Sequence, residues 1–158
     1  MSTESITQPK IDELLSMGKR VVNPTAHFLI KGQHQQKNFR VTGADDNSFT
    51  LYLRQNTKIP ENFSCGLSWN MPSGEVLTLV RYNGPSHPHS NQMERQTLGF
   101  ECHIHRTTAR YIEAGKKPEG YAEATKGYET LNGALHCLVN DCNITGIQTD
   151  PDQPDLFT

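Results

Sequence analysis

Apolar residues recur along the chain with two different periods, and each period predicts one kind of element. Within residues 8–17, Ile11, Leu14 and Leu15 follow the spacing of three and four that is typical of an amphipathic helix. Pro9 suits the first turn of such a helix, where the N–H that proline lacks is not needed. We therefore expect a short helix near the N-terminus that buries one stripe of side chains.

The middle of the chain alternates apolar and polar residues with a period of two, which is typical of half-buried strands. The segments with this pattern are 48–54, 63–69 and 75–82. A short turn at residues 71–74 (Met-Pro-Ser-Gly) joins the last two, so we expect these two to pair antiparallel. Residues 26–31 and 38–42 form a further candidate hairpin around Gly32.

Residues 100–105 alternate again, and this pattern predicts another strand. Phe100, Cys102 and Ile104 would point to one side, which is expected to face the core. The intervening polar residues would then point to the opposite side. A short helix capped by Thr107 or Thr108 should follow this strand.

The longest helical pattern covers residues 121–138, and we expect this helix to lie across the sheet. The order of a helix, several strands and further helices predicts an α+β fold. Its antiparallel sheet would have four to five strands, with the N-terminal and C-terminal helices packed on one face. The length of 158 residues is typical of a single domain. We place this domain at residues 1–148 and a flexible C-terminal tail, rich in Asp and Pro, at 149–158.

Composition and charge narrow the classes of partner. The formal net charge is −2 and the isoelectric point is near 6.4, so a nucleic acid would have to be bound through a local basic patch. No segment reaches the roughly 18 apolar residues of a membrane span, and the N-terminus has no apolar signal-peptide stretch. The four cysteines form no C-x-x-C pair. We therefore expect a cytoplasmic protein with free, buried thiols and no membrane partner.

Histidines supply the most distinctive chemistry, because four of the seven form two His-x-His pairs, His87 with His89 and His103 with His105. On a strand, the second spacing places both imidazoles on one face, with Cα atoms about 6–7 Å apart. A sharp turn is expected at residues 83–85 (Asn-Gly-Pro). This turn would bring the first pair of histidines back over the second pair.

One interpretation is metal-independent cleavage of RNA through the ribose 2′-OH. This reaction needs a base for the 2′-OH proton, an acid for the leaving 5′-oxygen and a cation for the phosphorane charge. Imidazole suits both proton transfers, and the arginine guanidinium matches phosphate oxygens. The catalytic candidates are His103, His105, His87 and Arg81, and the candidates for substrate binding are Arg54, Tyr82, Asn83, His89, Arg106 and Arg110.

Two other interpretations stay open. The same imidazoles could bind a divalent metal such as zinc or manganese and serve a metal-dependent hydrolase. The alternative ligands are His87, His89, His103 and His105. The polar residues could also bind a partner without catalysis, as in a phage–host defence or anti-defence protein. His27, His34 and His136 stand alone in the sequence and are interpreted as ordinary surface or hydrogen-bonded residues.

The order of these residues resembles a known pattern. Residues 81–89 (Arg-Tyr-Asn-Gly-Pro-Ser-His-Pro-His) followed by 103–105 (His-Ile-His) resemble the R-Y-D-N-x-P-H-H … H-x-H pattern of TumE-type bacterial toxins. These toxins are regarded as relatives of the RelE-like and barnase-like ribonucleases. The Asp of that pattern is absent here, and Pro88 separates the two histidines.

This resemblance covers residues 81–105 and implies a function and partners. It implies an endoribonuclease toxin of a bacterial toxin–antitoxin or phage-defence system, with RNA as substrate, an antitoxin or other protein as partner and no cofactor. Residues 63–67 and 109–113 also resemble a bacterial and phage family to which no activity is assigned.

Overall fold

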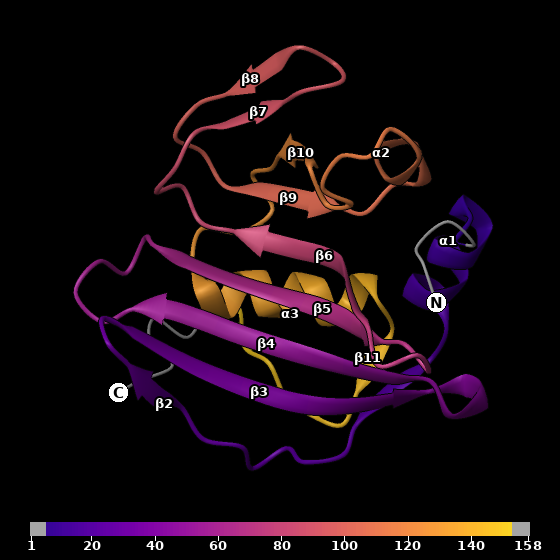
Figure 1. Cartoon of the computed structure of the whole chain (residues 1–158). Helices are drawn as coiled ribbons and strands as arrows, with labels where there is room; N and C mark the ends of the chain where they lie inside the picture. The colour runs from indigo at the N-terminus through magenta and orange to yellow at the C-terminus, as the bar shows by residue number, and fades with distance from the viewer. Residues whose placement is uncertain (1–5, 153–158) are drawn as a thin grey trace.

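The computed structural model describes residues 6–152 (Figure 1). Within this range the α-helices are α1 (Gln8–Ser16), α2 (Ala109–Glu113) and α3 (Leu131–Asp141), and Ala44–Asp46 forms a 3-10 turn. The strands are β1 (Lys19–Val21), β2 (Leu29–Lys31), β3 (His34–Gly43), β4 (Ser48–Asn56), β5 (Phe63–Asn70), β6 (Val76–Asn83), β7 (His89–Asn91), β8 (Gln96–Leu98), β9 (His103–Arg106), β10 (Tyr121–Ala124) and β11 (Ile144–Thr145).

Nine of these strands form one mixed sheet in the order β10-β9-β6-β5-β4-β3-β1-β11, with β2 paired to the start of β3. Only β1 and β11 pair parallel among the described strands, and β7 and β8 form a separate hairpin. The predicted α+β fold with four to five strands and helices on one face is therefore wrong, because the described chain is mostly β, with 11 strands. The five strands that the sequence patterns did not predict, β1, β7, β8, β10 and β11, have two to four residues, too few for alternation to be recognised.

The first helix and the central strands confirm the sequence patterns that predicted them. The Thr7 hydroxyl accepts a hydrogen bond from the Lys10 N–H and caps α1, which buries Ile11 and Leu14. The predicted strands 48–54, 63–69 and 75–82 correspond to β4, β5 and β6. The last two pair antiparallel across the predicted turn, where Gly74 adopts a φ of 93°.

The hydrophobic core lies between the sheet and α3, which runs behind β4, β5 and β6 (Figure 1). Leu51, Leu67 and Tyr82 of the sheet are buried against Leu135 and Leu138 of α3. The opposite face of these strands carries polar side chains. This division is the reason that the central strands alternate in sequence.

The predicted helix 121–138 is wrong in its first half. Tyr121–Ala124 is strand β10, which pairs with β9, and the helix begins only after Thr130, whose hydroxyl caps it by accepting the Gly133 N–H. The helical spacing at the start of this segment arises because Tyr128 is a core residue in the connecting loop. Pairing with a strand distant in sequence decides the conformation of β10, and no local pattern reports it.

The predicted strand 100–105 begins only at His103. Residues 99–101 form a tight turn in which the Glu101 N–H donates to the Gly99 carbonyl. Phe100 is 74% exposed, so its predicted place in the core is wrong. Side chains alternate between the two faces of the sheet only in residues 103–106, which pair with β6, and not in residues 100–102.

The remaining sequence-based expectations concern thiols, membrane and tail. All four cysteines are free, and Cys65, Cys102 and Cys142 are buried as predicted, whereas Cys137 is only partly buried. Among the helices of residues 6–152, none is long and apolar enough to cross a membrane. Of the predicted flexible tail, 149–158, only the first four residues are described, and within them the Asp152 N–H donates to the Asp150 carboxylate. Residues 153–158 lie outside the described residues.

Candidate active site

Two rows of polar side chains cross the face of the sheet opposite α3. Each row is fixed by strand register, because residues that pair across neighbouring strands point to the same face. One row consists of Tyr52, Gly66, Arg81 and His105, and the next consists of Arg54, Ser64, Asn83 and His103. The prediction that His103 and His105 share a face turned away from the core is thereby confirmed.

Three imidazole rings meet at the end of these rows. The ring centroids of His103 and His105 are 5.0 Å apart, and His89 of β7 lies 5.8 Å from His103 and 4.6 Å from His105. The loop after β6 therefore folds back over β9, as the turn at residues 83–85 predicted. His87 does not share these ring contacts and stands exposed at the rim of a neighbouring cleft.

Each of the three rings donates one ring N–H to a backbone carbonyl. His103 and His105 donate through Nδ1 to the carbonyls of Glu101 and Glu119, both at 2.9 Å. His89 donates through Nε2 to the Gly120 carbonyl at 2.7 Å. A carbonyl only accepts, so these contacts fix the tautomers. In the neutral rings, Nε2 of His103 and of His105 and Nδ1 of His89 keep a lone pair.

Burial controls the charge of the two histidines on β9, which are 2% and 4% exposed. Burial, with the Arg81 cation as the next cause, lowers the pKa of His105 to about 3. Burial likewise lowers the pKa of His103. Both rings are therefore neutral near pH 7, and each keeps one nitrogen with a free lone pair.

Arg81 is held in place by two residues outside the predicted catalytic and substrate-binding sets, Glu119 and Tyr52. Its Nη1 lies 3.6 Å from Oε2 of Glu119, a carboxylate that is only 8% exposed. Arg81 also hydrogen bonds to Tyr52, whose hydroxyl pKa is raised by burial. The ring of Tyr52 lies directly over Gly66, where a Cβ would stand 2.4 Å from the phenol. Glu119 carries no sequence signal beyond being one carboxylate between Pro118 and Gly120.

A cleft of about 180 Å³ opens beside this arrangement. Its polar lining consists of Arg54, Asn62, Ser64, Arg81, Asn83, Ser86, His87 and His103. Two guanidinium groups and two imidazoles thus border one space. The Oδ1 atom of Asn83 is buried without a hydrogen-bond partner among the described residues. An amide acceptor in that condition favours a ligand that brings a donor.

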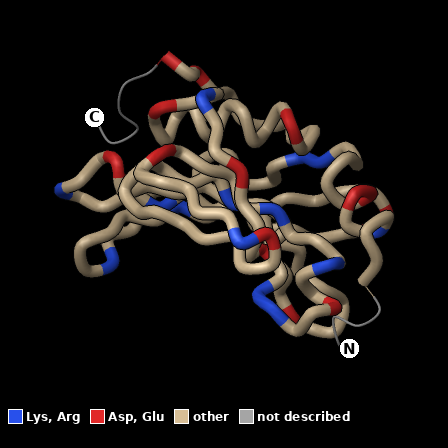
Figure 2. Tube along the Cα trace, turned by 90° about the horizontal axis from the view of Figure 1, so that it is seen from above, with Lys and Arg blue, Asp and Glu red and all other residues tan. Residues whose placement is uncertain are grey.

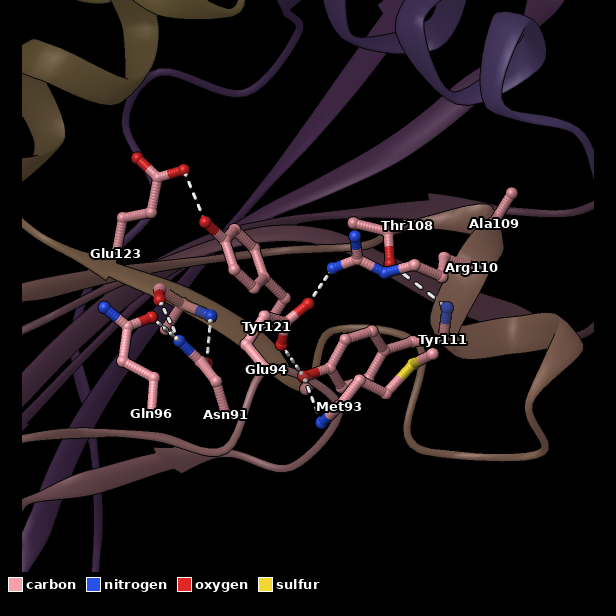
Figure 3. A network of polar contacts seen from close by, with 12 residues as sticks. Asn91, Met93, Glu94, Gln96, Thr108, Ala109, Arg110, Tyr111, Tyr121 and Glu123 are labelled. Atoms are coloured by element: carbon pink, nitrogen blue, oxygen red, sulfur yellow. Dashed lines mark hydrogen bonds and ion pairs between the residues drawn. The ribbon is translucent and has the colours of Figure 1, made fainter.

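Three predicted substrate-binding residues lie outside both the cleft and the histidine cluster. Tyr82 is buried on the α3 face, where its hydroxyl donates to Asp141. Arg106 follows His105 and so points to the same α3 face, where its charge acts on Tyr82. Arg110 of α2 pairs with Glu94, which lies in the turn between β7 and β8 (Figure 3). Strand alternation and helix position thus direct these three side chains away from the cleft, and their part in substrate binding stays a prediction.

A buried asparagine positions the loop that carries His89. The Asn91 side chain accepts the Ala122 N–H and donates to the Ala122 carbonyl, both at 2.8 Å, and also donates to Gln96 (Figure 3). It thereby pairs with the edge of β10 as a further strand would. The β7–β8 hairpin is attached to the large sheet by this side chain, and the attachment sets the position of His89.

Charge outside the cleft is mixed. Lys and Arg residues are interspersed with Asp and Glu along the chain trace, in agreement with the small net charge (Figure 2). Within residues 6–152, no group of three or more His, Cys, Asp or Glu side chains is placed to hold a metal ion. Zinc or manganese binding by the histidines therefore stays a prediction.

Comparisons with known proteins add no further constraint. No family model, curated protein or solved structure matches the chain. The functional assignment therefore rests on the geometry of the polar face.

Proposed function

We propose that the protein is a metal-independent endoribonuclease that cleaves RNA in the cleft beside His103. The single observation that carries this proposal is the meeting of a neutral, tautomer-fixed imidazole with two arginines in that cleft. The resemblance of residues 81–105 to TumE-type toxins supports the same reaction and suggests the biological setting, a toxin–antitoxin or phage-defence system in the bacterial cytoplasm.

His103 is the general base in this proposal. Its Nδ1–H is bound to the Glu101 carbonyl, so Nε2 carries the lone pair. Nε2 takes the proton of the ribose 2′-OH while the 2′-oxygen forms a bond to phosphorus. The lowered pKa keeps His103 in the neutral form that a base requires.

His87 and the arginines complete the reaction. His87 stands exposed at the rim of the cleft, and from there it supplies the proton to the departing 5′-oxygen. The P–O5′ bond breaks, and the products are a 2′,3′-cyclic phosphate and a 5′-hydroxyl. Arg81 and Arg54 stabilise the negative charge that develops on the phosphoryl oxygens.

His105 serves as a positioning residue in this scheme. It does not line the cleft, its ring lies 5.0 Å from that of His103, and its cross-strand partner is Arg81. Its neutral ring packs beside His103 and Arg81 and adds no charge to the site. This role differs from the acid or base role that the sequence suggested for it.

The test is cleavage of end-labelled RNA by the purified protein in the presence of EDTA. We expect cleavage that leaves a 2′,3′-cyclic phosphate and spares DNA of the same sequence, which lacks the 2′-OH. His103→Ala and His87→Ala should each reduce the rate at least a hundredfold. His27→Ala, at an exposed position outside the polar face, is the matched control and should leave the rate unchanged.

Two outcomes would overturn the proposal. Binding of RNA with no cleavage would favour the non-catalytic binding protein. Cleavage that stops in EDTA and returns with zinc or manganese would favour the metal-dependent hydrolase. Expression in a bacterial host gives a second readout, since the wild type should arrest growth and the His103→Ala variant should not.

A further inference from the structure

A second cleft lies on the other side of the histidine cluster, between β7 and the segment that joins α2 to β10. Its volume is about 340 Å³, nearly twice that of the first cleft and within the usual range of ligand sites. The lining includes His89, Gln92, Tyr111, Lys116 and Lys117. None of the residues assigned to the proposed reaction lines it.

The two clefts share a wall of imidazoles. His89 lines the second cleft and His103 lines the first, and their rings stack with a centroid distance of 5.8 Å and an interplanar angle of 15°. A ligand that reaches the base in the first cleft has therefore only one layer of side chains to cross. This proximity would allow one extended ligand to occupy both clefts.

The second cleft is locally basic although the chain as a whole is acidic. Lys116 and Lys117 both line it, and no carboxylate does. Two nearby carboxylates that do not line the cleft are already paired, Glu94 with Arg110 and Glu119 with Arg81. Lys116 Nζ donates to Gln92 Oε1 at 3.2 Å, a contact that orients the ammonium group. Two cations with no ion pair among residues 6–152, in a cleft of this size, favour an anionic ligand.

We infer that the second cleft binds the phosphate next to the scissile one, so that a single RNA strand runs across the histidine cluster and occupies both clefts. This inference rests on the proposed function, and it names the substrate as a single-stranded segment instead of a duplex or a mononucleotide. Lys116 and Lys117 contact phosphate as point charges, so they contribute affinity without a preference for base sequence.

The test uses a single-stranded RNA oligonucleotide with 2′-O-methyl groups, which binds but cannot be cleaved, and measures its affinity by fluorescence anisotropy at several salt concentrations. The Lys116→Gln/Lys117→Gln variant should bind about tenfold more weakly, with a salt slope smaller by about one, because a single phosphate loses its contacts. The matched control, Lys31→Gln/Lys126→Gln, changes the same number of exposed lysines away from the cleft and should bind as the wild type does.

The Lys116→Arg/Lys117→Arg variant separates charge from folding of the loop, and it should keep most of the affinity. Equal affinities and salt slopes for the two Gln variants would overturn the inference. So would a wild type that does not bind the oligonucleotide at low salt. Failure of the proposed function is a different result, namely a wild type that binds the methylated strand with the predicted lysine dependence but does not cleave unmodified RNA.

Discussion

Arg81 and His105 are direct cross-strand partners on β6 and β9, and Glu119 binds both of them. Its carboxylate pairs with the guanidinium, and its backbone carbonyl accepts the His105 Nδ1–H. One residue of a loop thus neutralises the cation and fixes the tautomer of the adjacent ring. The three groups behave as a unit, since a change in one alters the charge or the orientation of the others.

Replacing Glu119 by Gln removes the carboxylate while keeping the backbone contact to His105. Arg81 would then be a half-buried cation without its ion pair, and we expect a loss of about 1–3 kcal/mol in the free energy of unfolding. Urea denaturation checks this value. The matched control is Glu13→Gln, which breaks the exposed Lys10–Glu13 pair and should cost at most about 0.5 kcal/mol. Equal losses for both variants would contradict a special role for Glu119.

The lowered pKa of His105 predicts a specific loss of stability in acid. The unfolded chain protonates this ring near its ordinary pKa of 6.5, and the folded protein does so only near a pKa of about 3. Between these values the unfolded state binds more protons, so stability is fully present above about pH 6.5 and falls as the pH drops toward 3. We expect this ring alone to remove about 2–3 kcal/mol between pH 7 and pH 4.

His105→Asn isolates that contribution, because the amide can still donate to the Glu119 carbonyl but does not titrate. The difference in unfolding free energy between pH 7 and pH 4 should shrink by about 2–3 kcal/mol in this variant. His27→Asn, at an exposed site, should keep the wild-type difference. The same pH dependence in all three proteins would mean that His105 is not buried as a neutral ring.

The sequence predicted those parts of the fold that local patterns determine. β4, β5 and β6 alternate because one face meets α3 and the other is polar, and α1 follows from its cap and apolar stripe. β10 was missed, because it is held by β9 and by the Asn91 side chain, which are distant in sequence. A strand of four residues has too little pattern of its own to outweigh an accidental helical spacing.

The candidate site likewise contains residues that local spacing predicts and residues that depend on distant parts of the chain. His103 and His105 could be placed on one face, since a spacing of two on a strand allows no other result. Glu119 could not be found, because its contact with Arg81 depends on where the loop after α2 returns. Tyr52 depends on the register of β4 against β5, which brings its ring over Gly66. Register is a property of the whole sheet and not of either strand alone.

Gly66 is predicted to be required for the position of Tyr52. In Gly66→Ala the new methyl group would overlap the phenol, so the ring must move and its hydrogen bond to Arg81 is lost. We expect a loss of about 1–3 kcal/mol in unfolding free energy and a lower cleavage rate. Gly99→Ala, where a Cβ meets open space, is the control and should change stability by less than about 0.5 kcal/mol.

A double-mutant cycle tests the cause of the Gly66 effect. If overlap with the ring is responsible, Gly66→Ala should cost much less in a Tyr52→Ala background, with a coupling of about 1 kcal/mol or more. Additive effects would show that the alanine acts on the backbone of β5 and not through Tyr52.

Asn91 is predicted to control the histidine cluster from a distance. Asn91→Ala leaves the N–H and the carbonyl of Ala122 without the partners they have now, at a buried position, and should cost about 2–4 kcal/mol. Because the lost bonds attach only the β7–β8 hairpin to β10, the effect should be local. Hydrogen exchange should accelerate in β7, β8 and β10, while amides of β4 and β5 keep their protection.

The same change should displace His89, which leaves the Gly120 carbonyl when the hairpin opens. RNA binding should therefore weaken more than the chemical step, so KM rises and kcat changes little. Asn38→Ala, at an exposed position of β3, is the control for both measurements. Uniformly faster exchange across the large sheet in Asn91→Ala would show that this side chain supports the whole fold and does not act as a local attachment for the site.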